Sequence, residues 1–247
     1  MPADLTAIAH RPWPLPARPW LWRQTWSDLA FLHYRIDAEQ LRPLLPGPLR
    51  IQEFDGSAWL GVVPFRMRHV APRGWPGAAV LPDFPELNLR TYVEVGGKPG
   101  VWFFSLDADS PAMVWGGRLL YGLPYRFAHI RFSATADGYA LTSVRHDHRA
   151  AFAVCYNPTG PEFTAQPGTF EHWATERYCL YTTHPGGPLR RIDVHHAPWP
   201  LRRAEAVIAE NTLTVAAGLA LENHPPVCHF SPGVDVVSFP AMPAGLH

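Results

Sequence analysis

The chain has little lysine, cysteine or charge. Lys and Arg together number 21, yet Lys98 is the only lysine, so chemistry that needs a lysine amine, such as Schiff-base formation, has a single candidate residue. The three cysteines, Cys155, Cys179 and Cys228, are widely spaced and allow neither a disulfide framework nor a Cys-x-x-Cys metal site. Only 17% of the 247 residues are charged and the formal net charge is +0. We therefore expect neither a nucleic-acid partner nor an anionic membrane, which would require a basic patch.

Long hydrophobic runs and targeting signals are also missing. No stretch approaches the roughly 18 apolar residues of a membrane span, and the start, MPADLTAIAHRPWPLP, lacks a basic region followed by an apolar run. A Gly-rich phosphate loop and a Gly-x-Ser-x-Gly elbow are absent as well. We expect a cytoplasmic protein without a cofactor.

Prolines and short β-type runs dominate what is present. The 28 prolines are spread over the whole chain, which argues against long helices. Alternating or aromatic runs bounded by turn residues predict strands, with hairpin turns at Gly96-Gly97 and Asp137-Gly138. The predicted strands are 57–70, 87–95, 100–108, 125–135, 139–147, 151–156, 177–183, 190–197 and 234–239.

Helix signals are few. Asp37 and Thr169 are candidate N-caps of short helices, and Ser110 followed by Pro111 is typical of a helix start. The strongest helix prediction covers 201–219, where apolar residues form a partial stripe that ends at Gly218. About ten strands with four short helices predict a mostly β (α+β) fold, a closed or nearly closed β-structure with helices packed on it. We treat 1–247 as a single domain in which 1–20 form an extended Pro- and Trp-rich arm.

The segment FPELNLRTYVEV carries the most informative pattern. On a strand, Glu86, Asn88, Arg90 and Tyr92 share one face, because successive side chains point to opposite sides. This polar face could be the solvent side of a sheet or the lining of an interior. Two features favour the interior: Asn is uncommon in strands, and the following strand, 100–108, is apolar on both faces apart from two residues.

A second informative segment is GGRLLYGLPYR, residues 116–126. Arg118 follows two glycines, which permit close backbone approach, and precedes an apolar run. Its charge is either exposed or paired inside, since an unpaired buried charge is costly. Glu86 is the nearest candidate partner.

The polar residues of a third segment, TERYCLY, allow two interpretations. TERYCLY carries Glu176, Arg177, Tyr178 and Tyr181, which either add polar groups to an interior or make cross-strand pairs. Cys179 in the same motif is expected to be buried and inert. Among 13 histidines, His146 and His148 alternate on a predicted strand, but no ligand spacing supports a metal site, and we expect none.

Several motifs resemble those of the acetoacetate decarboxylase family. HYRIDAEQLRPLLPGPLRI (33–51) and KPGVWFFSLDADSPAMVWGGRLLYGLPYR (98–126) are similar to two long segments of that family. FPELNLRTYV, GVWFFSLDA, TERYCLY and HxPWPL, at 84–93, 100–108, 175–181 and 196–201, resemble a bacterial branch, a domain of unknown function. The resemblance extends from Trp26 to Phe239. It implies an acetoacetate decarboxylase-like, closed or cone-shaped β-barrel with an interior cavity and a few short helices outside.

The same resemblance argues against the decarboxylase reaction. The family's Schiff-base lysine and the lysine beside it correspond to Tyr125 and Arg126, and the position of its assisting arginine falls near Ser27. A phenol cannot form an iminium, and Lys98 lies in GGKPG, an expected solvent-facing turn. One functional carboxylate of the family carries over onto Glu86. Arg118 matches a family arginine, but Leu119 replaces the glutamate that follows it.

We therefore expect a protein that binds a small organic acid or carbonyl compound in the cavity. Glu86 is the candidate acid or base, Arg118 or Arg90 could hold a carboxylate or enolate oxygen, and Tyr125 could donate a hydrogen bond. The candidate catalytic residues are Glu86, Arg118 and Tyr125, and the candidate substrate-binding residues are Asn88, Arg90, Tyr121 and Arg126. If the protein is an enzyme, a lyase or proton-transfer reaction is expected. The alternative is a structural or interaction module with a filled barrel. The resemblance also leaves open a homodimer or larger homo-oligomer.

Overall fold

The computed structural model describes residues 3–221 and 224–245, most of which lie in one large sheet. Its strands are β1 (Trp22–Ile36), β2 (Arg50–Ile51), β3 (Ala58–Pro72), β4 (Phe84–Val95), β5 (Lys98–Ala108), β6 (Tyr125–Ala134), β7 (Tyr139–Arg145), β8 (Ala151–Thr164), β9 (Cys179–Thr182), β10 (Arg190–His196), β11 (Pro200–Asn211), β12 (Val227–Ser238) and β13 (Met242–Pro243). The helical elements are short: α1 (Ala38–Leu41), the 3₁₀ turn η1 (Arg42–Leu44), α2 (Pro111–Tyr121), α3 (Phe170–Thr175) and α4 (Leu213–Ala216). The predicted mostly β fold with a few short helices is confirmed.

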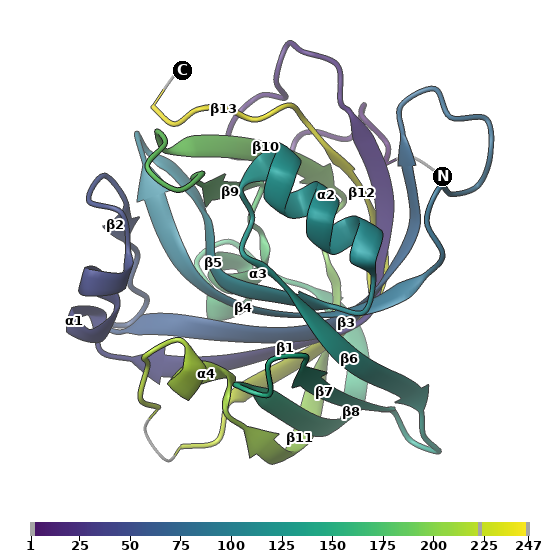
Figure 1. The fold of residues 1–247 in the computed structure, drawn as a ribbon, viewed down its shortest axis with the longest axis vertical. Helices are drawn as coiled ribbons and strands as arrows, with labels where there is room; N and C mark the ends of the chain where they lie inside the picture. The colour runs from purple at the N-terminus through teal and green to yellow at the C-terminus, as the bar shows by residue number, and fades with distance from the viewer. Residues whose placement is uncertain (1–2, 222–223, 246–247) are drawn as a thin grey trace.

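Seven of these strands pair in a closed ring. The ring runs β1–β3–β4–β5–β9–β10–β12 and returns to β1. Most neighbours are antiparallel, whereas β5 and β9 pair in parallel. Figure 1 looks into this ring, with α2 crossing its near end and α3 visible behind it. The closure leaves an interior into which every second side chain of each ring strand points.

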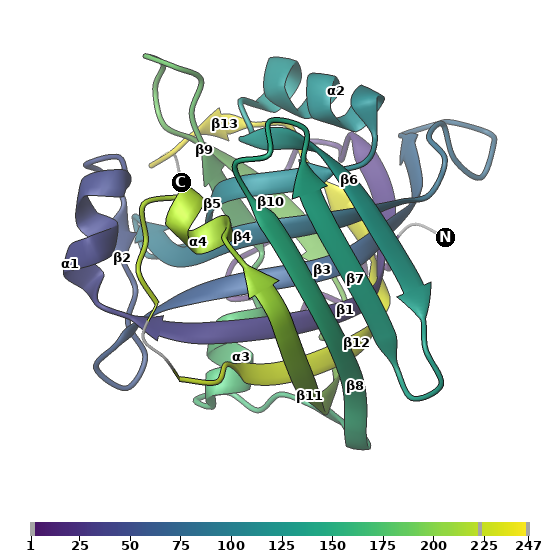
Figure 2. The same cartoon turned by 60° about the horizontal axis from the view of Figure 1, so that its bottom comes forward.

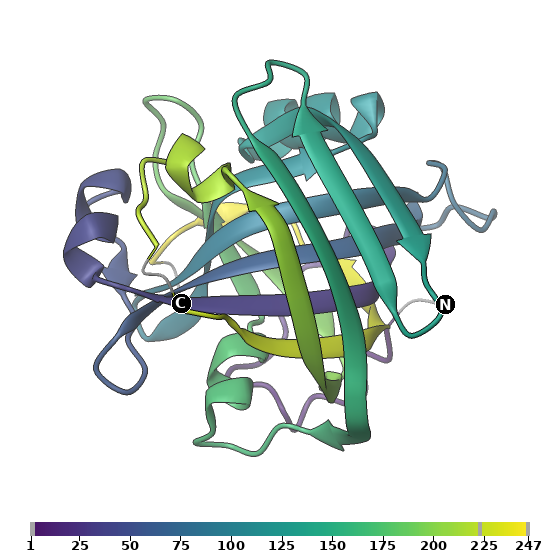
Figure 3. The same cartoon turned by 90° about the horizontal axis from the view of Figure 1, so that it is seen from below.

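A second layer covers the outside of one half of the ring. Strands β6, β7, β8 and β11 leave the ring at β5 and rejoin it at β12, crossing over β1, β3 and β4 (Figures 2 and 3). The core between the layers contains Leu32, Leu60, Leu87, Leu89 and Phe152, all at most 1% exposed. Strand β4 is therefore buried on both faces, one against this core and one toward the ring interior.

Helix α2 forms where its capping residues predict. The Ser110 Oγ accepts a hydrogen bond from the Met113 backbone N–H at 3.4 Å, and Pro111 occupies the first turn. Gly122 ends the helix in the left-handed conformation, with φ 67°. Asp37 and Thr169 likewise cap α1 and α3. In Figure 2, α2 lies at the top of the molecule and α3 at the bottom, so the two helices mark opposite ends of the ring.

The prediction of a helix over residues 201–219 is wrong. Most of that segment is strand β11, and only Leu213–Ala216 is helical. Alanine, glutamate and arginine favour a helix locally, but β11 is held by antiparallel pairing with β8 along most of its length and by a short pairing with β12. Its exposure alternates along the chain as a half-buried strand requires, so tertiary pairing overrides local propensity.

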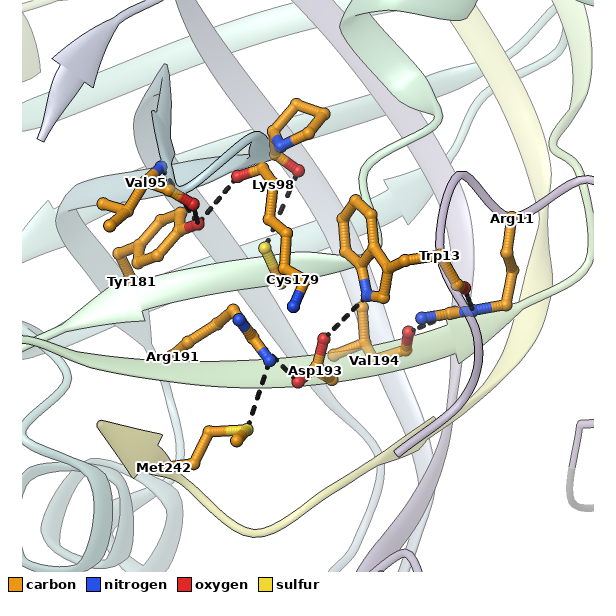
Figure 4. Close-up of polar contacts among 11 residues, drawn as sticks. Arg11, Trp13, Val95, Lys98, Cys179, Tyr181, Arg191, Asp193, Val194 and Met242 are labelled. Carbon is orange, nitrogen blue, oxygen red and sulfur yellow. Dashed lines mark hydrogen bonds and ion pairs between the residues drawn. The ribbon is translucent and has the colours of Figure 1, made fainter. Parts of the chain in front are cut away.

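The N-terminal arm is bound to β10 by hydrogen bonds. Figure 4 shows Arg11 and Trp13 against this strand, where Arg11 Nη1 donates to the Val194 carbonyl at 2.7 Å and Trp13 Nε1 donates to Asp193 Oδ1 at 3.1 Å. His10 Nε2 also lies 2.9 Å from the His196 carbonyl oxygen. These contacts cover the outer side of the ring at β10. No helix in the described ranges is long and apolar enough to span a membrane.

Candidate functional site

The ring contains a partly open cavity of about 270 Å³. Its walls come from β1, β3, β4, β5, β9, β10 and β12, and α2 covers one end. Most of the lining is apolar, with Leu29, Phe31, Phe65, Phe103 and Trp199 among the larger side chains. A largely apolar hollow with a few converging polar groups is the usual form of a small-molecule site.

Strand β4 supplies the polar wall, as its alternation predicts. Glu86, Asn88 and Arg90 line the cavity, while Leu87 and Leu89 face the core outside the ring. Tyr92 follows on the same face but is fully buried just beyond the cavity, where its hydroxyl lies 2.6 Å from His33 Nε2. The prediction that the polar face of this strand lines an interior is therefore confirmed.

Glu86 and Tyr125 form a buried pair at the α2 end. The Tyr125 hydroxyl donates to Glu86 Oε2 at 3.1 Å, and the two residues are 5% and 2% exposed. Burial raises the pKa of Glu86 to about 8, an effect that the hydrogen bond from Tyr125 partly opposes and the nearby Asp107 reinforces. Burial and Glu86 raise the pKa of Tyr125 well above its ordinary value. Glu86 is thus mostly a neutral carboxylic acid near pH 7 and can give up a proton close to that pH.

Helix α2 lies directly on this pair. Met113, Gly116, Gly117 and Leu120 line the cavity, a spacing that places them on one helix face. A Cβ on Gly117 would lie 2.4 Å from two carbons of the Tyr125 ring. The second glycine of the pair is therefore needed for α2 to approach Tyr125, whereas Gly116 has open space around it.

Two predicted site residues lie outside the cavity lining. Arg118 was expected inside and near Glu86, but the turn of α2 directs it away, and its Nε donates to the Tyr125 carbonyl oxygen at 2.8 Å while its guanidinium lies over Phe127. Arg126 is exposed, because it follows the inward-facing Tyr125 on β6 and therefore points to the opposite side. The expected cavity position of both arginines is wrong. Tyr121, by contrast, does line the cavity.

The other end of the cavity is basic. Arg90 and Arg177 both line it, and their guanidinium carbons lie 5.7 and 5.1 Å from the centre of the Tyr92 ring. Arg177 Nε donates to the Trp173 carbonyl of α3 at 2.6 Å, and its Nη1 contacts Gln52 Oε1. Burial lowers the pKa of Arg177 to about 10, although Tyr92 opposes this shift. The cavity thus runs from a carboxylic acid beneath α2 to two guanidinium groups beside α3.

Sequence reasoning left some of this lining undecided. Arg177 of TERYCLY was assigned either to the interior or to cross-strand pairing, and the structure places it in the cavity wall, whereas the carboxylate of its neighbour Glu176 accepts from the Trp199 backbone N–H. Trp26 and Trp199 were not predicted as lining residues. Their indole rings are stacked 6.1 Å apart in the wall. The HxPWPL motif, in which Trp199 lies, was the available signal.

Comparison with known proteins agrees with this architecture. The model of the DUF2071 family, described as "Uncharacterized conserved protein", matches residues 23–235. "Uncharacterized protein YqjF" of Bacillus subtilis is 41% identical over 227 residues, which are 92% of this chain and 93% of that protein.

This chain belongs to the DUF2071 family.

The fold of this DUF2071 protein is acetoacetate decarboxylase-like. An acetoacetate decarboxylase from Legionella pneumophila superposes with a TM-score of 0.62 at 15% identity, covering 97% of this chain and 95% of that one. The enduracididine biosynthesis enzyme MppR, in its complex with pyruvate, gives a TM-score of 0.64 at 16% identity, covering 94% and 93%. At these identities the likeness concerns the fold alone.

The single lysine of this DUF2071 chain is not among the cavity-lining residues. Lys98 begins β5 and is half-buried, which corrects its expected exposure in a solvent-facing turn. Figure 4 shows it beside Tyr181, whose hydroxyl donates to the Lys98 carbonyl oxygen at 2.7 Å. The cavity wall therefore presents a phenol at Tyr125 and no lysine amine.

One further nucleophile candidate, Cys179, lies in the cavity wall, and the two candidate metal ligands lie outside it. Cys179 is 1% exposed, and burial raises the pKa of its thiol to about 12. His146 and His148 lie beyond the end of β7, in a turn rather than on the strand predicted for them. In residues 3–221 and 224–245, no three His, Cys, Asp or Glu side chains are grouped so that they could hold a metal ion.

Proposed function

We propose that this protein binds a small organic acid or carbonyl compound in the ring cavity, with Glu86 and Tyr125 as the groups that hydrogen-bond to the ligand and exchange protons with it. The observation that carries the proposal is the buried Glu86–Tyr125 pair in the wall of an apolar cavity. A neutral carboxylic acid can donate to a carbonyl oxygen and, once ionised, accept a proton from an adjacent carbon. This chemistry suits a lyase or proton-transfer reaction.

The proposed function excludes Schiff-base decarboxylation. Iminium formation needs an unprotonated amine next to the bound carbonyl, and no lysine lines the cavity. Stabilisation of an enolate would instead rest on a hydrogen bond in a low-dielectric site, here from the acid form of Glu86, whose Oε2 accepts from Tyr125.

The cavity beside Tyr125 favours binding over the alternative of a filled interaction module. A filled interior would leave no hollow at this position, and the structure has one of about 270 Å³.

A thermal-shift screen tests the proposed function. Keto acids, hydroxy acids, aromatic acids and simple ketones are added to the full chain, and the unfolding midpoint is followed. A ligand at 100 times its dissociation constant stabilises the protein by about 2.7 kcal/mol. We expect a shift with members of these classes that Glu86→Leu weakens, while Glu53→Gln, a change at an exposed position, leaves it intact. No shift with any compound, or equal shifts in Glu86→Leu and wild type, would refute the proposal.

A further inference from the structure

Two arginines in the cavity wall have no acidic partner. Arg90 makes no hydrogen bond or ion pair with any described residue, and its Nε and Nη2 are buried and unpaired. Arg177 is 6% exposed, lines the cavity and leaves its own Nη2 unpaired. The nearby carboxylate of Glu94 is already taken by Arg50 and by Gln52 Nε2 at 2.7 Å.

Such a pair attracts an anion, because Arg177 is buried, Arg90 is half-buried, and no carboxylate of the described residues pairs with either guanidinium. A buried charge without a counter-ion costs several kcal/mol, and two like charges near one another add to that cost. Guanidinium groups with free N–H donors bind carboxylates through charge-assisted hydrogen bonds. The α3 end of the cavity is therefore built to receive a carboxylate.

The end of the cavity at Glu86 suits an uncharged polar group rather than a carboxylate. Glu86 offers the hydrogen bond of a carboxylic acid while Tyr125 donates to its other oxygen. The two cations of the lining, Arg90 and Arg177, lie at the opposite end. A second carboxylate there would be desolvated without compensation, whereas a carbonyl oxygen would be satisfied. Between the two ends β4 contributes Asn88, whose Oδ1 is buried and unpaired, and the side chains around it are mostly apolar, among them Phe31 and Phe103.

The spacing of the two ends sets the approximate length of the ligand. Glu86 and Arg90 are four residues apart on β4, which is about 13 Å along a strand. For side chains that project in parallel from the strand, a hydrogen bond of about 2.9 Å at each end leaves about 7 Å between the polar ends of the ligand.

We infer that the ligand is an elongated monocarboxylate whose carboxylate is held by Arg90 and Arg177 and whose carbonyl group, about 7 Å away across a largely apolar body that passes Asn88, meets Glu86 and Tyr125. This inference rests on the proposed function and narrows it. Compact acids that carry the carbonyl next to the carboxyl carbon, or one carbon further, cannot reach both ends at once.

Calorimetric titration of the full chain tests the assignment with four ligands of graded structure. We expect 6-oxoheptanoate to bind about ten-fold or more tightly than 4-oxopentanoate, which is too short, than 6-oxoheptanamide, which lacks the charge, and than heptanoate, which lacks the carbonyl. Equal affinity for the acid and the amide, or for the long and the short keto acid, overturns the inference.

Variants assign each ligand end to its residues. In Arg90→Met we expect the acid to lose its advantage over the amide, while the amide binds as to wild type. In Glu86→Leu the keto acid should lose its advantage over heptanoate instead. Arg131→Met, at an exposed position on β6, is the control and should keep both preferences. Arg177→Lys, which retains charge but loses the fork geometry, should weaken acid binding less than Arg90→Met.

The outcomes separate this inference from the proposed function. If other acids or ketones bind in a manner that depends on Glu86, but Arg90→Met keeps the preference for acid over amide, the inference fails and the proposed function stands. If no acid, ketone or amide binds, both fail. Ligand-free Arg90→Met should unfold at a temperature no lower than wild type, because the change removes an unpaired charge. A large drop in that temperature would show a structural role and overturn the assignment.

Discussion

The Tyr125 hydroxyl donates to Glu86 Oε2 across 3.1 Å, and this contact joins β6 to β4 inside the ring. The sequence resemblance predicts that Tyr125 takes the position of the reactive lysine of the acetoacetate decarboxylase family. A lysine there would pair with an ionised glutamate, whereas the phenol leaves burial to dominate and keeps Glu86 protonated. A phenol instead of an amine at position 125 is therefore expected to change the protonation state of Glu86 as well as the nucleophile.

Stability should fall with rising pH because of Glu86. Its pKa is about 8 in the folded protein, against an ordinary value of 4.5, so the folded state binds more protons between these pH values. The free energy of unfolding therefore decreases from about pH 4.5 to about pH 8, by at most ~1.4 kcal/mol per pH unit. In Glu86→Gln this contribution disappears, and the variant should gain stability relative to wild type as the pH rises. Urea unfolding of both proteins at pH 5, 7 and 9 measures this difference in the free energy of unfolding.

The control for this prediction is Glu53→Gln, at an exposed position, which should follow wild type at each pH. Parallel stability curves for Glu86→Gln and wild type would contradict the raised pKa.

The two neighbouring glycines of α2 should respond oppositely to alanine. In Gly117→Ala the new Cβ meets the Tyr125 ring at 2.4 Å, and overpacking of this kind costs about 1–3 kcal/mol. Gly116→Ala meets nothing within 4 Å and should stabilise the helix by up to ~1 kcal/mol. Thermal unfolding of both variants gives the comparison. A loss of stability in both, or in neither, would mean that α2 does not rest on Tyr125 as described.

The buried ion pair between Asp107 and Arg145 should be essential for stability. Arg145 Nε and Nη2 donate to the two Asp107 oxygens at 2.8 and 2.9 Å, and Asp107 is 0% exposed. Asp107→Asn leaves Arg145 without its counter-ion, and we expect a loss of about 3–5 kcal/mol in urea unfolding. Because Asp107 also raises the pKa of Glu86, the variant should shift the pH dependence described above toward lower pH.

The surface pair of Arg35 and Asp55 provides the matched comparison. Its side chains are 49% and 73% exposed, and Asp55 has a positive φ of 53° that asparagine tolerates. Asp55→Asn should cost less than about 1 kcal/mol. Similar costs at Asp107 and Asp55 would refute the importance assigned to burial.

Local patterns predicted those parts of the site that depend on strand alternation and capping. The polar face of β4 follows from a period of two residues, and the start of α2 follows from Ser110 and Pro111. Arg118 was misplaced because sequence does not show which side of α2 faces the ring. The helix prediction for 201–219 was wrong because the composition of the segment suits a helix, whereas in the fold it pairs as a strand with β8 and β12. Strand β1, which has Asp28 at a φ of 56°, gave no clear strand signal and was missed.

A lysine placed in the cavity should introduce amine chemistry that the wild-type cavity lacks. In Tyr125→Lys the amine would lie in a buried position beside Glu86, where burial lowers the pKa of an amine and Glu86 opposes that shift. With a keto acid and borohydride we expect a reduced adduct on residue 125 of the variant, found by peptide mass mapping, and none in the cavity of wild type. Arg126→Lys, one residue away and exposed, is the control and should be labelled weakly. A reduced adduct on Lys98 of wild type, formed at the rate seen in Tyr125→Lys, would show that the protein retains a Schiff-base lysine and would refute the proposed mechanism.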